Sequence, residues 1–582
     1  MSPTVKYTFS LLRKYLKPYV QLVATLGAII VLYNTLQIFI PQVLRIYIDA
    51  AMSGTFDYKF LLTSSLIYIA ANLLHRILMV IMRYISIQLA WLTTNDLRVD
   101  LTSHCINLDM TFHNKLKTGD MIERIDGDST TLSEFFSTFS IYFLGSFLVI
   151  FGVLVAVFIE GWVYGVTFLG YTLVAFLAIF SVRNVVAPFW KKLRESTTAL
   201  YGNIEESVSG LEDIQPNGAG SYIMKRFHDF SRTNFKDGIK SAFYSRIYFL
   251  LTILMRAVIN LVILVIAGYF SDSLGINIGE LYLLLTYAST ILWPIRLIIW
   301  QIDMMQNSIA NIDRIKEFFD MKSKIEDTGT EVFPDRNIKL IFDNLSFGYK
   351  EDELVLKNIN FNLLPEKKIG LVGKTGSGKT TIARLIFRLY DPNDGAIRIN
   401  GHTARDYPLS ELRQNIAYVT QDVELFKASL KDNITFFNKE ITDEQVLNVI
   451  HELGLKDWFD KLPNGLESVI YSDEVGLSAG EEQLLALTRA FLKNPKIVIL
   501  DEASSRLDPA TERQVENALE KLLHGRSAII IAHRLPTLEK VDDIIILSQG
   551  EIIEAGSRSD LVSNPDSLFS ELIHKGMEGY LT

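Results

Sequence analysis

Long apolar stretches dominate the first half of the chain, whereas short strands and amphipathic helices alternate in the second half. Each apolar stretch can supply the roughly 20 consecutive residues that a helix needs to cross the hydrocarbon of a bilayer. We therefore expect an all-α transmembrane domain with six helices. The predicted spans are residues 19–50, 60–89, 135–159, 163–182, 248–270 and 278–299.

Basic residues distinguish the two sides of this predicted domain. The three short connections, after the first, third and fifth spans, contain one basic residue, Lys59. The two long connections, residues 90–134 and 183–247, are rich in Lys and Arg, so the positive-inside rule places them and both chain termini in the cytoplasm. Their pattern favours long helical extensions over coil. Basic residues in them include Arg98, Lys115, Lys117, Arg124, Lys191, Lys192, Arg194, Lys225, Arg226 and Lys236.

The N-terminal residues have an amphipathic pattern of their own. Phe9, Leu12, Tyr15 and Leu16 share one helical face, and Lys and Arg occupy the other. This pattern is typical of a helix that lies along a membrane surface. The apolar run that follows is too long for a cleavable signal peptide, so we expect it to stay in the protein as the first span.

The composition agrees with a membrane protein that also has a soluble part. Of the 582 residues, 49% are hydrophobic and only 21% are charged. The length exceeds the roughly 100–200 residues of a single domain. The net charge of −9 argues against the basic face of a nucleic-acid binder, so we expect no nucleic-acid partner. The single cysteine, Cys105, excludes an intramolecular disulfide.

The character of the chain changes around residues 317–337, where apolar runs give way to a charged segment. From Lys339 onward, β-branched strands alternate with amphipathic helices, which is the α/β pattern of a nucleotide-binding fold. We therefore expect a transmembrane domain over residues 1–325 and an α/β domain of the P-loop NTPase type over residues 326–582.

A glycine-rich segment between a strand-like run and a helical pattern predicts a phosphate-binding loop. The apolar residues 369–372 precede it, and apolar residues at helical spacing follow. Backbone N–H groups of such a loop surround a polyphosphate, while Lys379 would contact the β- and γ-phosphates and Thr380 would ligate Mg²⁺. The segment is Gly373, Lys374, Thr375, Gly376, Ser377, Gly378, Lys379, Thr380 and Thr381.

A second strand ends in two carboxylates. Residues 497–500 are all apolar, and Asp501 and Glu502 follow them directly. A buried parallel strand delivers such acids to the sheet edge where ligands bind in α/β folds. We expect Asp501 to hold Mg²⁺ and Glu502 to act as the base that activates the attacking water.

With these motifs the second half of the chain resembles the nucleotide-binding domain of an ATP-binding cassette (ABC) transporter. The resemblance implies that Tyr349 stacks on adenine, that Gln421 contacts Mg²⁺ and the γ-phosphate, and that His533 contacts the γ-phosphate. It identifies residues 477–481 (Leu-Ser-Ala-Gly-Glu) as the signature sequence. It also implies that the loop ending in Asp508 crosses the seam of a dimer.

The resemblance further implies a dimer with shared ATP sites. In the family, each ATP is held between one phosphate loop and the signature of the other domain, so Ser478 and the Gly480 N–H would face the partner's ATP. The first half resembles the exporter-type transmembrane domain. Segments 109–120 and 210–227 resemble its two cytoplasmic loops, of which the second crosses to the partner's nucleotide-binding domain.

Two positions of the signature depart from the family pattern. Ala479 and Glu481 stand where Gly and Gln are commoner, and residues 471–474 lack the usual Gly-Glu-Arg-Gly before the signature. An acid close to bound phosphate is repulsive unless a cation offsets it. Because Glu502 is intact beside an altered signature, we favour a heterodimer with unequal ATP sites. Ser478 and Gly480 are kept, so a homodimer stays open.

Arginines inside apolar spans need an explanation, because a charge at the centre of a membrane helix costs about 2.5–3.5 kcal/mol. Arg45 has Asp49 four residues further on as a partner. Arg296 is near enough to the end of its span to reach the interface. Arg256 has no acid three or four positions away, so it either lines the substrate path or pairs with a neighbouring helix.

These patterns predict one half of a dimeric exporter, an ATPase coupled to the transmembrane movement of a substrate, with ATP and Mg²⁺ as cofactors. We expect a multi-pass protein of a bacterial-type cell membrane. Its partners would be a second half-transporter, the lipid bilayer and a substrate that the sequence does not identify. An importer with the same fold and an ATP-gated channel are alternatives. Six spans argue against a soluble cassette ATPase of DNA repair or translation.

Overall fold

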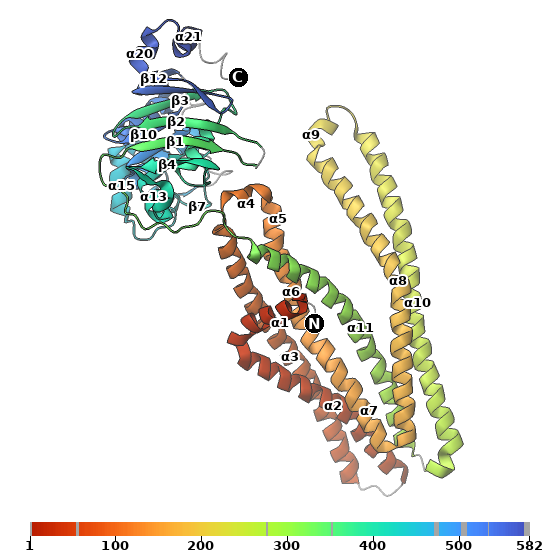
Figure 1. The fold of residues 1–582 in the computed structure, drawn as a ribbon. Coiled ribbons are helices and arrows are strands. Elements are labelled where there is room, and N and C mark those ends of the chain that lie inside the picture. The colour runs from red at the N-terminus through yellow and green to blue at the C-terminus, as the bar shows by residue number, and fades with distance from the viewer. Residues whose placement is uncertain are drawn as a thin grey trace. The chain divides into compact units, whose positions relative to one another are not determined.

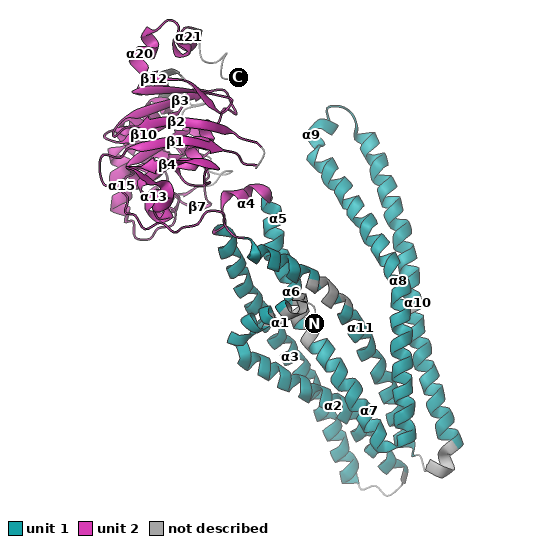
Figure 2. Cartoon of the chain, in the orientation of Figure 1, with its two compact units in different colours: residues 1–106, 118–321 teal, residues 107–117, 322–582 magenta. Residues whose placement is uncertain are grey.

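The computed structural model describes residues 3–53, 58–274, 277–350, 353–470, 477–501, 509–532 and 535–575. The chain divides into two compact units (Figure 2). Unit 1 comprises residues 1–106 and 118–321, and unit 2 comprises residues 107–117 and 322–582. A short segment from the first half of the chain therefore folds with the second half. The division of the domains at residues 325 and 326 stays a prediction.

The described part of unit 1 is helical throughout (Figure 1). Its long helices run up and down, and the pairs α2 and α3, α7 and α8, and α10 and α11 are joined by short connections. The helices are α1 (Pro3–Leu16), η1 (Lys17–Tyr19), α2 (Val20–Ser53), α3 (Tyr58–Ile106), α5 (Thr118–Ile122), η2 (Glu123–Gly127), α6 (Asp128–Phe139), η3 (Ser140–Leu144), α7 (Gly145–Glu160), α8 (Trp162–Ser209), α9 (Leu211–Ile214), α10 (Gly220–Leu274) and α11 (Ile278–Asp320).

Six helices of the described chain are long and apolar enough to cross a membrane, which confirms the predicted number. Large apolar side chains such as Phe151, Leu173 and Leu261 are exposed on them, as expected of a surface that contacts lipid. The predicted span 135–159 is not a uniform α-helix, because the π-helical turn η3 interrupts it. A single π turn accommodates an extra residue without breaking the helix.

Helices α8 and α10 extend far beyond their apolar parts. They contain 48 and 55 residues, or roughly 70–80 Å at 1.5 Å per residue, against the ~30 Å of hydrocarbon. The two helices pack against each other, and the small helix α9 lies between their polar ends (Figure 1). The charged connections therefore form helix rather than coil, as expected.

The main core of unit 1 joins α7, α8, α10 and α11. Val153, Phe168 and Ile263 are buried in it, together with the small side chain of Ala288 that lets neighbouring helices approach closely. Tyr287 is also fully buried, and its hydroxyl donates to the Ile38 carbonyl of α2 at 2.9 Å. Buried tyrosine hydroxyls usually have such a partner. This hydrogen bond ties α11 to α2.

Unit 2 contains a parallel and an antiparallel sheet (Figure 1). Five strands of the six-stranded sheet β12-β11-β3-β10-β9-β6 are parallel, and β12 is an antiparallel edge. The second sheet has the order β2-β1-β4-β5. The strands are β1 (Leu340–Phe347), β2 (Leu356–Leu363), β3 (Lys368–Gly373), β4 (Asp394–Ile399), β5 (His402–Thr403), β6 (Ile416–Val419), β7 (Ala428–Ser429), β8 (Val469–Ile470), β9 (Ile497–Asp501), β10 (Ser527–Ile531), β11 (Asp543–Ser548) and β12 (Glu551–Ser557).

The central strands β3, β9 and β10 are buried on both faces because helices and the second sheet cover them. They therefore consist almost entirely of apolar residues, and two cores form, one on each side. The helices of this unit are α4 (Met110–Lys115), α12 (Lys379–Ile386), η4 (Ala404–Asp406), α13 (Leu409–Asn415), α14 (Leu430–Thr435), α15 (Asp443–Glu452), α16 (Lys456–Phe459), η5 (Gly465–Glu467), α17 (Ala479–Leu492), α18 (Pro509–Leu523), α19 (Leu535–Leu538), α20 (Arg558–Ser563) and α21 (Leu568–Lys575).

Helix α4 is the part of the first half that folds with unit 2. Asp109 caps its N-terminus by accepting from the N–H groups of Thr111 and Phe112, and it also accepts from the N–H of Lys324. Burial opposes the charge on this carboxylate, but the N–H donors outweigh it and hold the pKa of Asp109 below its usual range. The same side chain therefore starts α4 and fixes it to the segment that leads into β1.

Candidate functional site

The predicted phosphate loop lies between β3 and α12, as its sequence context requires. Gly376 and Gly378 have φ of 83° and 105°, a left-handed region that favours glycine. A side chain at Gly378 would collide with Leu356, 2.4 Å from the Cβ position, whereas Gly376 faces open space. The loop is therefore closely packed beneath and open where a phosphate can approach its backbone.

Two polar side chains of the loop are buried next to its backbone. The Nζ of Lys379 is buried and donates to the carbonyls of Gly373 and Lys374, at 2.6 and 2.9 Å. Ser377 is 3% exposed, and its Oγ has no hydrogen-bond partner in the described chain. Buried polar atoms are almost always paired, so Ser377 offers a hydroxyl for a ligand. These groups suit a polyphosphate.

Tyr349 lies next to the same helix. Its hydroxyl is 3.2 Å from the Thr381 Oγ1 and accepts from Arg384 at 3.2 Å. Its ring meets the edge of Tyr390, with the ring centroids 5.2 Å apart, and 37% of the residue is exposed. The predicted adenine-stacking tyrosine is therefore fixed beside α12 and still has ring surface to offer.

Tyr390 connects this site to α4. The Asn114 side chain of α4 donates to the Tyr390 hydroxyl, and Met110 of the same helix packs against the neighbouring core. Burial raises the pKa of Tyr390, so its hydroxyl stays protonated. Asn114 and Tyr390 were not predicted, because a contact between residues so far apart in sequence leaves no local pattern.

Asp501 ends β9, whose parallel register with β10 pairs it with Ile531. The carboxylate is buried at 6% exposure and accepts from the Tyr418 hydroxyl of β6 at 3.2 Å. Burial and the neighbouring Asp501 charge both raise the pKa of Tyr418, so this hydroxyl donates throughout the physiological range. A tyrosine in an otherwise apolar buried strand was the available signal for this contact. Sequence reasoning missed it.

Three predicted site residues, Glu502, Asp508 and His533, lie outside the described residues. Two further ones are described. Gln421 follows β6 and is exposed, and Thr380 is the second residue of α12 and half-buried.

The signature forms the start of α17. Ser478 is its N-cap and makes a capping box with Glu481: the Glu481 N–H donates to the Ser478 Oγ at 3.4 Å, and the Glu481 carboxylate accepts from the Ser478 N–H at 2.8 Å. The Ser478 hydroxyl also donates to this carboxylate, at 2.9 Å. Ala479 opens the helix, and Gly480 is buried. Glu481 therefore engages the hydroxyl that the family resemblance assigns to ATP.

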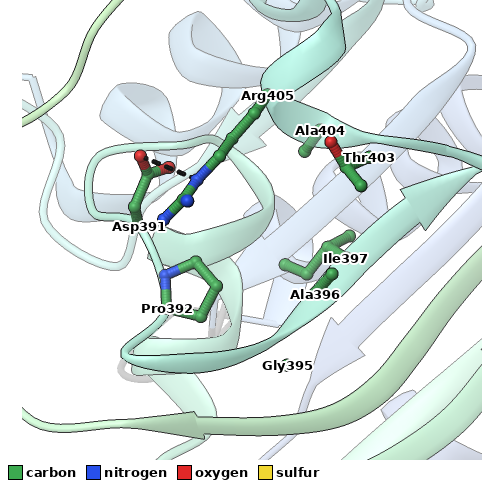
Figure 3. A pocket seen from close by; sticks show the side chains of 8 residues that line it. All are labelled: Asp391, Pro392, Gly395, Ala396, Ile397, Thr403, Ala404 and Arg405. Carbon is green, nitrogen blue, oxygen red and sulfur yellow. Dashed lines mark ion pairs between the residues drawn. The ribbon is translucent and has the colours of Figure 1, made fainter.

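A separate hollow of about 280 Å³ lies beside β4 (Figure 3). It is slightly smaller than the roughly 300–1,000 Å³ typical of sites for drug-sized ligands. Figure 3 shows Arg405 reaching the Asp391 carboxylate, at 3.2 Å, and Arg388 pairs with the same group at 3.1 Å. Its charges are paired and no predicted site residue lines it. The lining residues are Asp391, Pro392, Gly395, Ala396, Ile397, Thr403, Ala404 and Arg405.

Comparisons with known proteins agree with this architecture. The family model "ABC transporter transmembrane region" matches residues 23–295, and the model "ABC transporter" matches residues 356–505. The two models together match well over half of the chain.

Relatives match over most of their length. The chain is 29% identical over 573 residues to the ATP-dependent lipid A-core flippase of Idiomarina loihiensis, covering 97% of both proteins. It is 29% identical over 492 residues to the uncharacterized ABC transporter ATP-binding protein YfiC of Bacillus subtilis, covering 83% of this chain and 80% of that protein.

The fold is that of a solved exporter. The structure of a bacterial Atm1-family ABC exporter with ATP bound matches 95% of this chain and 99% of its own, at 23% identity and a TM-score of 0.80. The chain therefore belongs to the ABC transporters, as a half-transporter in which an exporter-type transmembrane region is followed by an ATP-hydrolysing nucleotide-binding domain.

Proposed function

We propose that the chain is one half of a dimeric exporter that moves its substrate out of the cytoplasm by alternating access. ATP would hold two nucleotide-binding domains together, and hydrolysis would remove the phosphate on which that closure depends. Both chain termini would lie in the cytoplasm. The relative named as an ATP-dependent lipid A-core flippase supports ATP-driven movement across a bilayer, and the match to a structure named as an exporter supports the outward direction.

The phosphate loop is the observation that carries this proposal. Two carbonyls of the loop hold the Lys379 ammonium group, and Ser377 offers a buried hydroxyl without a partner among the described residues. We assign ATP contacts to the loop, residues 373–381, and adenine stacking to Tyr349. The partner's ATP would be completed by Ser478, Gly480 and Asp508.

Hydrolysis would use groups at the carboxyl ends of the central strands. We assign the role of general base to Glu502, and contacts to the γ-phosphate to Gln421 and His533. Mg²⁺ suits the oxygen ligands of Thr380, Gln421 and Asp501. When bound, the ion would neutralise charge that develops on the phosphates.

Transport in sealed vesicles tests the direction and the energy source. A dimer reconstituted with its nucleotide-binding domains outside should accumulate substrate against a gradient only when Mg-ATP is present. Flow that stops at equal concentrations would indicate an ATP-gated channel instead. Accumulation only when the domains and ATP are inside would indicate an importer.

We also propose that the working unit is a heterodimer with unequal ATP sites. The capping box supports this, because Glu481 occupies the Ser478 hydroxyl and places a carboxylate at the signature. In a homodimer, both ATP sites would combine the base Glu502 with this altered signature. In a heterodimer, this chain's phosphate loop and Glu502 can face a better signature on the partner and form the hydrolytic site.

Expression of the chain alone and beside the half-transporter encoded next to it tests this second proposal. We expect ATPase activity and transport to depend on the neighbour, with one hydrolysing site per dimer. Full activity from the chain alone would contradict the heterodimer and leave the proposal of an exporter intact.

A further inference from the structure

Three arginines of unit 1 lie at matching positions along three different helices. Arg76 and Arg296 each lie 18 residues after the first residue of their helix, α3 and α11, and Arg256 lies 18 residues before the last residue of α10. At 1.5 Å per residue, each is about 27 Å along its helix from the end where the short connections lie. We call this end the short-loop end, and the three residues the arginine level.

The acidic residues of the same helices lie elsewhere. Those that occur in the apolar parts, Asp49, Glu160, Asp272 and Glu280, are all within four residues of the short-loop end of their helix. The rest of each apolar part is free of carboxylates. No Asp or Glu occurs in the sequence over residues 20–48, 58–95, 135–159, 162–194, 238–271 and 281–302.

Two acids at the short-loop end, Asp49 and Glu160, pair with a neighbouring cation. Arg45 pairs with Glu160 and also with Asp49, at 3.7 Å, which confirms the predicted pairing of Arg45 with Asp49. Asp49 in turn accepts from the N–H of Gly279 at 2.9 Å, and Gln42 donates to Glu160 at 3.3 Å. These contacts join α2, α7 and α11. Carboxylates nevertheless outnumber arginines at the short-loop end of these helices.

Two residues of the arginine level, Arg76 and Arg256, lack such compensation in the described part of the chain. Neither has an acidic partner among the described residues, and both are exposed. Next to Arg256 lies the buried hydroxyl of Tyr171, which has no hydrogen-bond partner within the described residues. The same holds for the Oδ1 of Asn260, one helical turn further along α10. Polar groups without partners thus collect on α8 and α10 around Arg256.

Basic and aromatic groups continue from Arg76 along α3. Arg83, two turns further and on the same face, donates to the Tyr142 hydroxyl at 2.9 Å. His75 stacks on Tyr33 with the ring centroids 4.1 Å apart, and its Nε2 is buried without a partner among the described residues. This surface offers hydrogen-bond donors and aromatic faces.

We propose that the transported substrate carries an anionic group, a phosphate or a carboxylate, that is bound at the arginine level. An arginine in or next to hydrocarbon favours a counter-ion, and its planar donors match the oxygens of either anion. The carboxylates of the short-loop end then disfavour the anion where the proposed function releases it. This inference rests on the proposed exporter function and specifies its substrate.

The anion can come from a lipid head group or from a soluble molecule, and one experiment separates these sources. The assembled dimer in nanodiscs of neutral phosphatidylcholine is titrated with phosphatidylglycerol of the same acyl chains, or with glycerol phosphate, and its ATPase activity is measured. We expect an anionic compound to stimulate it. In the variant Arg76→Gln, Arg256→Gln the half-saturating concentration should rise by at least about tenfold, because charge-assisted hydrogen bonds are lost. Stimulation by phosphatidylglycerol alone identifies a lipid-like substrate, and stimulation by glycerol phosphate a soluble one.

Arg194→Gln is the control, since it removes one arginine charge from α8 beyond the apolar part and should leave the half-saturating concentration unchanged. If these arginines only contact lipid head groups, the half-saturating concentration should be unchanged in the double variant. That result would overturn the inference. Equal stimulation by phosphatidylglycerol and by an uncharged lipid would overturn it as well. If the native dimer transports neutral and anionic compounds equally well with ATP, only this inference is refuted. If the native dimer shows no ATP-driven transport at all, the proposed exporter function is refuted.

Discussion

The phosphate loop and the signature of unit 2 are both expected to bind ATP, but their polar groups are engaged to different degrees. In the loop, Ser377 has a buried hydroxyl without a partner in the described chain, and Lys379 is held by two backbone carbonyls. In the signature, the Ser478 hydroxyl donates to the Glu481 carboxylate. The loop is therefore prepared for a phosphate, whereas the signature must first release one of its own hydrogen bonds.

The chemistry of residue 481 explains this difference. Glu and Gln both complete a capping box with a serine N-cap, which contributes about 1 kcal/mol to helix stability. A Gln side chain would also provide an NH₂ donor, whereas a carboxylate only accepts. Glu481 therefore keeps the start of α17 stable but offers no donor to a phosphate that approaches Ser478.

The largest expected effect concerns the phosphate-loop side of this comparison. If Glu502 is the general base, Glu502→Gln should slow ATP hydrolysis by roughly a hundred- to ten-thousandfold, the usual contribution of such a base. ATP binding should persist, so that the closed dimer accumulates. Steady-state ATPase activity and ATP binding in the assembled dimer test this. Glu516→Gln, an exposed acid of α18, is the control. Near-normal turnover of Glu502→Gln would refute the role.

Removal of the loop cation should have the next largest effect. Lys379→Ala takes away a charged donor to phosphate, worth about 1.5–3 kcal/mol for a hydrogen bond to a charged group, so we expect the Kd for ATP to rise about ten- to hundredfold. The thermal stabilisation by ATP should fall in proportion. Lys357→Ala removes an exposed cation from β2 and serves as the control. Unchanged ATP stabilisation of Lys379→Ala would contradict the assignment.

The contrast between local and distant contacts shows how much the sequence could predict. The helical spans, the strand before the phosphate loop and the turn at Gly378 follow from local patterns, and the structure has them in the expected order. The capping box of Ser478 and Glu481 was also visible as Ser-x-x-Glu, but we interpreted the acid only through its repulsion of phosphate. The side chain of Glu481 therefore has two interpretations, one as a helix cap and one as an acid close to bound phosphate.

Contacts between distant segments could not be predicted in this way. Tyr418 reaches Asp501 only because β6 and β9 are neighbours in the sheet. The docking of α4 on unit 2 depends on Asp109 meeting the N–H of Lys324, more than 200 residues later. Such pairings depend on the tertiary fold, which hydrophobic periodicity does not specify. The roles assigned to the individual site residues stay predictions, and Glu502, Asp508 and His533 also lie outside the described ranges.

Substitution of Glu481 should reduce the difference between loop and signature. Glu481→Gln keeps the cap and adds a donor, so we expect ATP facing this signature to bind up to about tenfold more tightly, as one added hydrogen bond to a charged group allows. Equilibrium ATP binding in a Glu502→Gln background, where hydrolysis is suppressed, measures this. Glu482→Gln neutralises the next residue, which is outside the capping box, and is the control. Equal or weaker ATP binding in Glu481→Gln would show that the carboxylate does not limit this site.

The smallest effect should come from the contact that links the phosphate-loop side to α4. Tyr390→Phe removes the hydroxyl that accepts from Asn114 while it keeps the ring beside Tyr349. One hydrogen bond contributes about 0.5–1.5 kcal/mol, so the free energy of unfolding should decrease only slightly. Basal ATPase activity should change less than about twofold. If α4 passes movement between the nucleotide-binding domain and the membrane domain, the amount of substrate moved per ATP should nevertheless fall.

Tyr407→Phe is the control, because it loses a comparable buried hydrogen bond, to the Ile399 carbonyl at 3.0 Å, and not one to α4. A decrease in coupling that is equal in both variants would mean that the hydroxyl of Tyr390 acts through stability alone, whereas a decrease confined to Tyr390→Phe would assign the contact with α4 to transport.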